Sequence, residues 1–167
     1  MNEEQVGKTV LDSAFHVHTV LGPGLLESVY EAAMVLDLRR RGMRVEHQIS
    51  IPVFFEGVKL DVGFRADLIV EDKVLVELKS VEGVTPLFKK ITLNYLKLIP
   101  LKLGFLINFN EERLKDGITR IVNQHEGKGM FQNRGAQSPF RPSPPSRPSR
   151  DPCSTPSPSP PSRGQAV

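Results

Sequence analysis

The sequence predicts an α/β domain with a mixed central sheet flanked by helices, followed by a disordered C-terminal tail. Apolar residues alternate between helical and strand spacing in the order α, α, β, β, β, α, β, α, and 167 residues suit one domain. The composition then changes near Gln132: of the last 36 residues, 10 are Pro and 8 are Ser, which favours disorder. We therefore assign residues 1–131 to the domain and residues 132–167 to the tail.

Two helices are expected at the start of the domain. The apolar residues of the first recur at intervals of three or four: Val6, Val10, Ala14 and Val17. The Gly-Pro-Gly run at 22–24 interrupts this helix. A second helix is expected from about Leu25 to Arg41, with Gly42 as its C-terminal cap.

Three strands are expected next, at residues 44–55, 64–70 and 74–79, because apolar and polar residues alternate there. Turns are expected at Glu56-Gly57 and at residues 71–73. A helix should begin near Pro86, and the apolar run at 102–109 should form a buried strand. Residues 110–124 predict a last helix with Asn110 as its N-terminal cap.

Composition excludes several classes of protein and site. No run approaches the 18 or so apolar residues of a membrane span, and the first residues do not resemble a signal peptide, so we expect a cytoplasmic protein without a membrane partner. Cys153 is the single cysteine, which excludes an intramolecular disulfide and a cysteine-based zinc cluster. The four histidines show no zinc-binding spacing.

The positive charge of the chain lies mainly in the tail. Residues 132–167 hold five Arg and one Asp, which leaves residues 1–131 with a net charge of −1. A case for nucleic-acid binding by the domain must therefore be local. The residues that could form a basic surface, if they are not merely solvated, are Arg39, Arg40, Arg41, Arg44, Lys89, Lys90 and Lys97. The tail is either a polyproline II ligand, a contact for anionic polymers, or a solvated extension.

The two strands around residues 71–73 place charged side chains together. Their apolar sets must face the same core, and a three-residue loop satisfies this by pairing Val70 with Val74. The same register sets Asp67 opposite Glu77, with Cβ atoms about 5 Å apart. Facing carboxylates destabilise a sheet unless they bind something, and Mg²⁺ is a hard cation held by such oxygens. Lys79, two residues along, could then orient water or balance charge on a phosphate. Alternatively, the hairpin faces solvent and Lys79 only neutralises an acidic neighbour.

Asp67 followed by Glu77-Leu78-Lys79 resembles the signature of the PD-(D/E)XK nuclease superfamily, with Ala66 in place of the proline of that signature. Residues 24–30, GLLESVY, resemble the pattern of the GxxExxY family within it, and the resemblance covers about residues 5–124. It implies a restriction-endonuclease-like αβββαβ core and a nuclease that hydrolyses phosphodiester bonds with Mg²⁺ or Mn²⁺. Its partner would be nucleic acid, DNA rather than RNA, and the oligomeric state stays unknown.

The resemblance also assigns roles to residues. Asp67 and Glu77 would bind the metal, Glu27 would reach it directly or through water, and Lys79 would complete the catalytic set. Tyr30 lies one helical turn after Glu27 and would support the site or the substrate. Without the resemblance, Tyr30 is a core or interface aromatic, and Glu27 pairs with Arg65 or is a charge at a helix end.

One part of the family pattern is altered. Relatives carry a run like H-x-A-Q-x-x-x-Y-L on the helix after the third strand, where this chain has Phe88, Lys90 and Ile91 and keeps only Tyr95. Ile91 removes the hydrogen-bonding amide of the family glutamine, for which Lys90 or Asn94 could compensate. The alternative to a nuclease is therefore a degenerate nuclease fold that acts as a binding or regulatory module.

Overall fold

The computed structural model describes residues 1–124, apart from the side chain of Val62. The predicted tail at 132–167 lies outside these residues. Nine elements follow one another in the chain: α1 (Glu3–Leu21), α2 (Glu27–Arg40), β1 (Val45–Phe55), β2 (Val58–Val70), β3 (Val74–Lys79), α3 (Pro86–Leu98), β4 (Leu103–Asn108), α4 (Leu114–Gly117) and β5 (Ile118–Val122). The predicted αβββαβ core is therefore confirmed, from α2 to β4. Within residues 1–124, no helix is long and apolar enough to cross a membrane.

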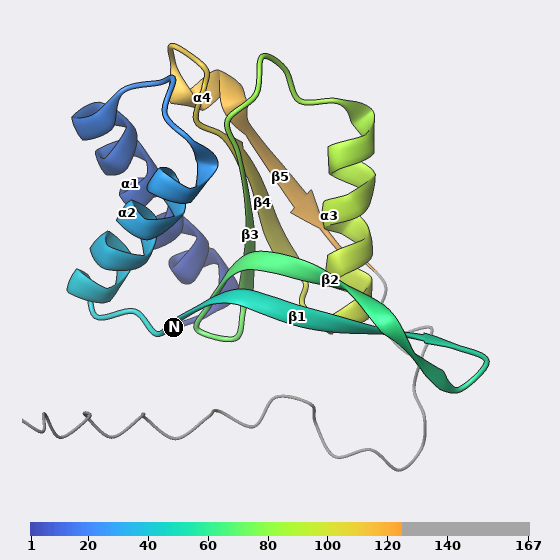
Figure 1. Ribbon diagram of the computed structural model, residues 1–167. Helices are drawn as coiled ribbons and strands as arrows, with labels where there is room; N and C mark the ends of the chain where they lie inside the picture. The colour runs from blue at the N-terminus through green and yellow to red at the C-terminus, as the bar shows by residue number, and fades with distance from the viewer. Residues whose placement is uncertain (125–167) are drawn as a thin grey trace, which may run out of the picture. The chain divides into compact units, whose positions relative to one another are not determined.

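The five strands form one mixed sheet in chain order, β1 to β5. Neighbouring strands are antiparallel except β3 and β4, which are parallel because α3 crosses between them. Figure 1 shows α1 and α2 on one face of the sheet and α3 on the other. Both faces of β3 are therefore covered, and residues 74–78 are all buried.

The main core lies between the sheet and the two N-terminal helices. Val6, Val10 and Ala14 of α1 are fully buried there, as the helical spacing predicts. On the opposite face, Leu96 of α3 packs directly over Gly104 of β4. The domain is thus a three-layer sandwich of helix, sheet and helix, with β3 near its centre.

The second helix begins two residues later than predicted and ends at Arg40, one residue earlier, with Arg41 instead of Gly42 as its C-cap. Gly42 follows it with φ 79°, a left-handed conformation that favours glycine. The Gly42 N–H donates to the Arg39 carbonyl, and the Met43 N–H donates to the Leu38 carbonyl at 3.0 Å each. These two bonds make a Schellman motif and turn the chain into β1.

The first hairpin is longer than the sequence predicted. β2 begins at Val58 instead of residue 64, directly after a turn in which Glu56 and Gly57 both have positive φ, as in a type I′ turn. The far half of this hairpin extends beyond the rest of the sheet in Figure 1. Residues 58–63, VKLDVG, alternate apolar and polar side chains, a strand signal that the prediction left out.

The predicted last helix at 110–124 is wrong. Only Leu114–Gly117 is helical, Asn110 does not cap a helix, and Ile118–Val122 forms β5 against β4. The β-branched residues of β5 favour a strand once an open edge is available. Gly117 makes the approach possible, because a Cβ atom there would lie 2.3 Å from the Asn108 carbonyl oxygen.

Candidate active site

Charged side chains from three elements meet at the carboxyl end of β3. The Lys79 ammonium lies 2.9 Å from Glu77 Oε1, 3.4 Å from Glu27 Oε1 and 3.9 Å from Asp67 Oδ2. It also donates a hydrogen bond to the Leu78 carbonyl. The predicted catalytic residues Glu27, Asp67, Glu77 and Lys79 are therefore brought together around one cation, although Glu27 is separated from the others by more than 35 residues of sequence.

The predicted three-residue loop is confirmed, and it sets the register of β2 on β3. Val70 pairs with Val74, and the paired residues end at Leu68 and Val76, one position before the two acids. Beyond that point, the Asp67 carboxylate accepts the Leu78 N–H at 2.8 Å. The strands thus separate at the site, and a side chain replaces the next backbone pairing.

The two strand carboxylates are buried, contrary to the alternative of a solvent-facing hairpin. Asp67 is 9% exposed and Glu77 is 6% exposed. Burial raises the pKa of Asp67 to about 6, against the opposing effects of the Leu78 N–H and Lys79. Burial and then the charge of Asp67 raise the pKa of Glu77 to about 7. For both carboxylates, the positive charge of Lys79 does not offset the effect of burial, and the folded state favours the neutral, protonated form.

Glu77 has an unsatisfied oxygen as well. Among the side chains that the structure describes, Glu77 Oε2 is the buried polar atom with no hydrogen-bond partner. Buried polar atoms without partners are rare, and a catalytic role or a bound ion is among their explanations. An acceptor oxygen in an acidic site is suited to a hard cation such as Mg²⁺.

Lys79 occupies the middle of the acidic cluster. Burial alone would lower its pKa, but Glu77, Asp67 and Glu27 outweigh burial, so the pKa is raised. No three His, Cys, Asp or Glu side chains within residues 1–124 converge into a ready metal site. Carboxylate oxygens are suitable ligands for a divalent cation, and here the Lys79 ammonium lies between them.

Glu27 is the first residue of α2, and Tyr30 holds the segment that leads to it. The buried Tyr30 hydroxyl donates to the Gly22 carbonyl at 2.7 Å and accepts the Leu25 N–H at 3.0 Å. Its ring stacks on Phe109, with centroids 4.5 Å apart. Ser80, next to Lys79, donates to the Leu25 carbonyl at 2.6 Å. Tyr30 therefore supports the site from the core, and its buried ring is not placed to contact a substrate.

Replacing Tyr30 by Phe tests this support. The ring still fits, but the Leu25 N–H and the Gly22 carbonyl lose their partner, so we expect the free energy of unfolding to fall by about 1–2 kcal/mol. Urea unfolding measures it. Thr9→Ala, which removes one exposed hydroxyl bond to the Gln5 carbonyl, is the control and should change stability by less than about 0.5 kcal/mol. A Tyr30→Phe variant as stable as wild type would contradict the role.

The face of α3 near the site is less polar than the H-x-A-Q-x-x-x-Y-L run with which it was compared. Phe88 lies under the Lys79 ammonium, with the ring centroid 5.8 Å from Nζ. Tyr95 is buried, and burial together with Glu77 and Asp67 raises its pKa, which places its hydroxyl in the field of the acids. Ile91 lies between them at helical spacing, and Lys90 and Asn94 are exposed. No contact in the structure ties Lys90 to the acidic cluster.

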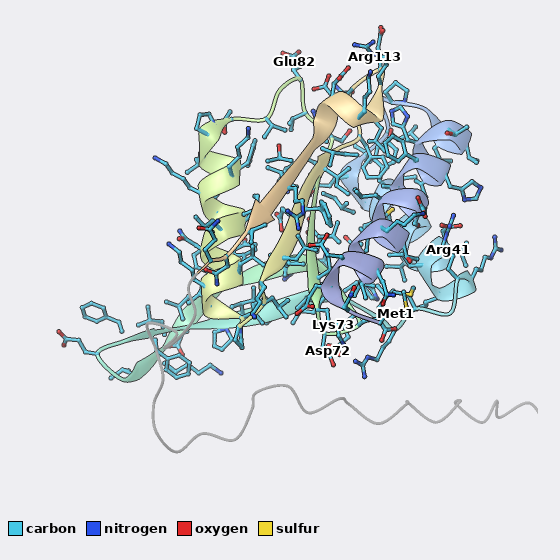
Figure 2. All side chains as sticks on the ribbon, turned by 180° about the vertical axis from the view of Figure 1, so that it is seen from behind. Met1, Arg41, Asp72, Lys73, Glu82 and Arg113 are labelled. Carbon is cyan, nitrogen blue, oxygen red and sulfur yellow. The ribbon has the colours of Figure 1, made fainter. Side chains whose placement is uncertain are left out.

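The predicted basic surface is divided. Arg39, Arg41 and Arg44 bind the Val45 carbonyl, Asp37 and Asp72, respectively. The lysines of α3 lie on the opposite face of the sheet from α2, and Figure 2 shows Arg41 on the far side of the domain from α3. These seven residues therefore do not make one continuous patch.

One supporting residue was missed in the sequence. Asn108, at the end of β4, is fully buried and pairs in register with Lys79. Its side chain accepts the Val81 N–H at 3.0 Å and donates to the Val81 carbonyl at 2.8 Å. It thereby fixes the loop directly after the site. A polar residue in the otherwise apolar run at 103–109 was the available signal.

A comparison with family models identifies the fold. The model of the PD-(D/E)XK nuclease superfamily matches residues 4–121. This chain belongs to the PD-(D/E)XK nuclease superfamily. Searches of curated proteins and of solved structures found no match.

Membership of the PD-(D/E)XK superfamily gives the acidic cluster a context. The match spans α1 to β5 and includes every residue of the cluster. Proteins of this superfamily are generally nucleases, and they typically use divalent metals. The domain therefore has a nuclease-like fold, with the charged residues of the signature assembled at the end of β3.

Proposed function

We propose that this chain is a divalent-metal-dependent nuclease of the GxxExxY family that cuts DNA rather than RNA and acts in the cytoplasm. The observation that carries the activity is the meeting of Glu27, Asp67 and Glu77 around the Lys79 ammonium. Gly24, Glu27 and Tyr30 support the family assignment, because they follow its pattern. Oxygen ligands of this kind suit Mg²⁺ or Mn²⁺.

The acids and the lysine would divide the work of phosphodiester hydrolysis. Asp67 and Glu77, with help from Glu27, would hold the cation, which supplies charge stabilisation and lowers the pKa of water. Lys79 is long enough to leave Glu77 and donate to a phosphate oxygen as negative charge develops there. Water attacks phosphorus and the P–O ester bond breaks, which leaves a phosphomonoester and a hydroxyl end.

A cleavage assay tests this function. Supercoiled plasmid, linear duplex, single-stranded DNA and RNA are each incubated with the full chain in Mn²⁺, Mg²⁺ or EDTA. We expect cleavage of DNA that needs the metal and that falls at least about 100-fold in Asp67→Asn, which loses a ligand charge. Calorimetric titration of Mn²⁺ into the same two proteins measures binding separately from cleavage.

A binding or regulatory module is the second candidate, and the α3 face favours it. Phe88 and Ile91 present no hydrogen-bonding group where the family pattern has His and Gln. Such a module would bind Mn²⁺ through Asp67 and cut none of the four substrates. If neither protein bound Mn²⁺, the cluster would be an ion-pair network and the chain an interaction protein.

A further inference from the structure

Gln48 interrupts β1 beside the acidic cluster. Its φ is 53°, in the left-handed region that non-glycine residues rarely adopt, and it is the one such residue in the interior of a described strand. The pairing of β1 with β2 passes from His47 and Leu68 to Ile49 and Ala66, and so skips Gln48 and Asp67. The interruption therefore falls directly opposite a proposed metal ligand. Strained backbone of this kind persists only where surrounding contacts hold it, and it gathers at functional sites.

The contacts that hold Gln48 come from two other elements. Its amide Nε2 donates to Glu31 Oε2 of α2 at 2.5 Å, and its Oε1 accepts from Arg65 Nη1 of β2 at 3.3 Å. His47 Nδ1 lies 3.3 Å from the other Glu31 oxygen. The Gln48 side chain thus bridges α2 and β2 through one donor and one acceptor, which a primary amide supplies and a carboxylate or ammonium does not.

Both anchors of this bridge lie next to the acidic cluster. Glu31 follows Glu27 by four residues, so the two side chains lie on the same side of α2, one turn apart. Arg65 precedes Asp67 by two residues and lies on the same side of β2. The bridge therefore links the two elements that carry Glu27 and Asp67.

We propose that Gln48 is a positioning residue that sets α2 against β2 so that Glu27 and Asp67 act on one cation. The proposal rests on the proposed function, because it assigns these two carboxylates to a shared ligand. From this left-handed backbone the Gln48 amide donates to Glu31, and the Asp67 position makes no regular pair with β1. On the β3 side, the Asp67 carboxylate accepts the Leu78 N–H.

Mn²⁺ titration of Gln48 variants in the full chain tests the proposal. Gln48→Leu keeps the size and loses both bonds, and we expect its Mn²⁺ Kd to rise about tenfold, the usual lower range for loss of a supporting contact. Gln48→Gly also loses both bonds but adopts positive φ without strain, so it should be as stable as wild type while binding Mn²⁺ about tenfold more weakly. Weaker binding without lower stability distinguishes positioning from a merely structural role.

Asn2→Ala is the matched control, since it removes a helix-capping hydrogen bond far from the cluster. It should lower the melting temperature and leave the Mn²⁺ Kd unchanged. Wild-type affinity in Gln48→Gly would overturn the positioning role and leave the nuclease proposal standing. Absence of Mn²⁺ binding by the wild-type chain would overturn both. If Gln48→Leu failed to fold, Gln48→Gly would still decide the question.

Discussion

We expect Lys79→Met to bind Mn²⁺ at least about tenfold more tightly than the wild-type chain, because the variant no longer places a positive charge among the ligand oxygens. We expect its cleavage rate to fall at least about 1000-fold, because the donor to the developing phosphate charge is lost. Mn²⁺ titration and a plasmid cleavage assay measure the two effects. Tighter Mn²⁺ binding would show that the Lys79 ammonium competes with the metal for the carboxylates. Slower cleavage would show that the same ammonium takes part in catalysis.

The control for this substitution is Lys115→Met, which removes an exposed ammonium on α4 and should change neither quantity. Weaker Mn²⁺ binding by Lys79→Met would contradict the proposal that the Lys79 ammonium competes with Mn²⁺ for the carboxylates. It would mean that the lysine organises the three carboxylates for the metal, and that its ammonium does not have to move away before the metal binds.

The second large effect is on stability against pH in the absence of metal. The pKa of Glu77 is raised in the folded state to about 7, so the stability that its protonated form contributes is present below pH 4.5 and is lost as pH rises through 7. Asp67 acts in the same direction between 3.8 and about 6. For Glu77 the loss is on the order of 3 kcal/mol. Lys79 keeps its charge over this range, because its pKa is raised from 10.5.

Glu77→Gln should remove the Glu77 part of this loss. In EDTA, we expect the variant to match the wild-type free energy of unfolding at pH 4.5 and to exceed it at pH 8, as measured by urea unfolding. Glu112→Gln, at an exposed carboxylate in the loop after β4, is the matched control and should follow the wild-type curve. A Glu77→Gln variant less stable than wild type at pH 8 would show that the ion pair with Lys79 outweighs the burial of Glu77.

The hairpin and its acids could be predicted from the sequence because strand geometry leaves little choice. Side chains alternate along a strand, and the apolar side chains of β2 and β3 must face the same core. Only a loop with an odd number of residues satisfies both conditions. That argument placed Asp67 and Glu77 together. It did not predict that both acids are buried, because the burial of a side chain depends on elements from other parts of the chain.

The errors also have physical causes. Residues 118–122 have helical spacing as well as β-branched side chains, and the open edge of β4 decided between the two structures. Gln48 could not be predicted, because its left-handed backbone depends on Glu31 and Arg65, which lie 17 positions away on either side. The prediction of one basic surface was wrong for a similar reason, since the sequence does not say on which face of a sheet a helix will pack.

The contact between Glu27 and Lys79 joins residues 52 positions apart, and it has a consequence for synthesis. β3 is held on one side by β4, which the ribosome makes after both residues. Contacts of such long range form late, because the intervening chain must first be ordered. We therefore expect the acidic cluster of a nascent chain to assemble only after β4 is made. If the cluster cuts nucleic acid, the growing polypeptide is harmless to the transcripts and the genome around it until the domain is nearly complete.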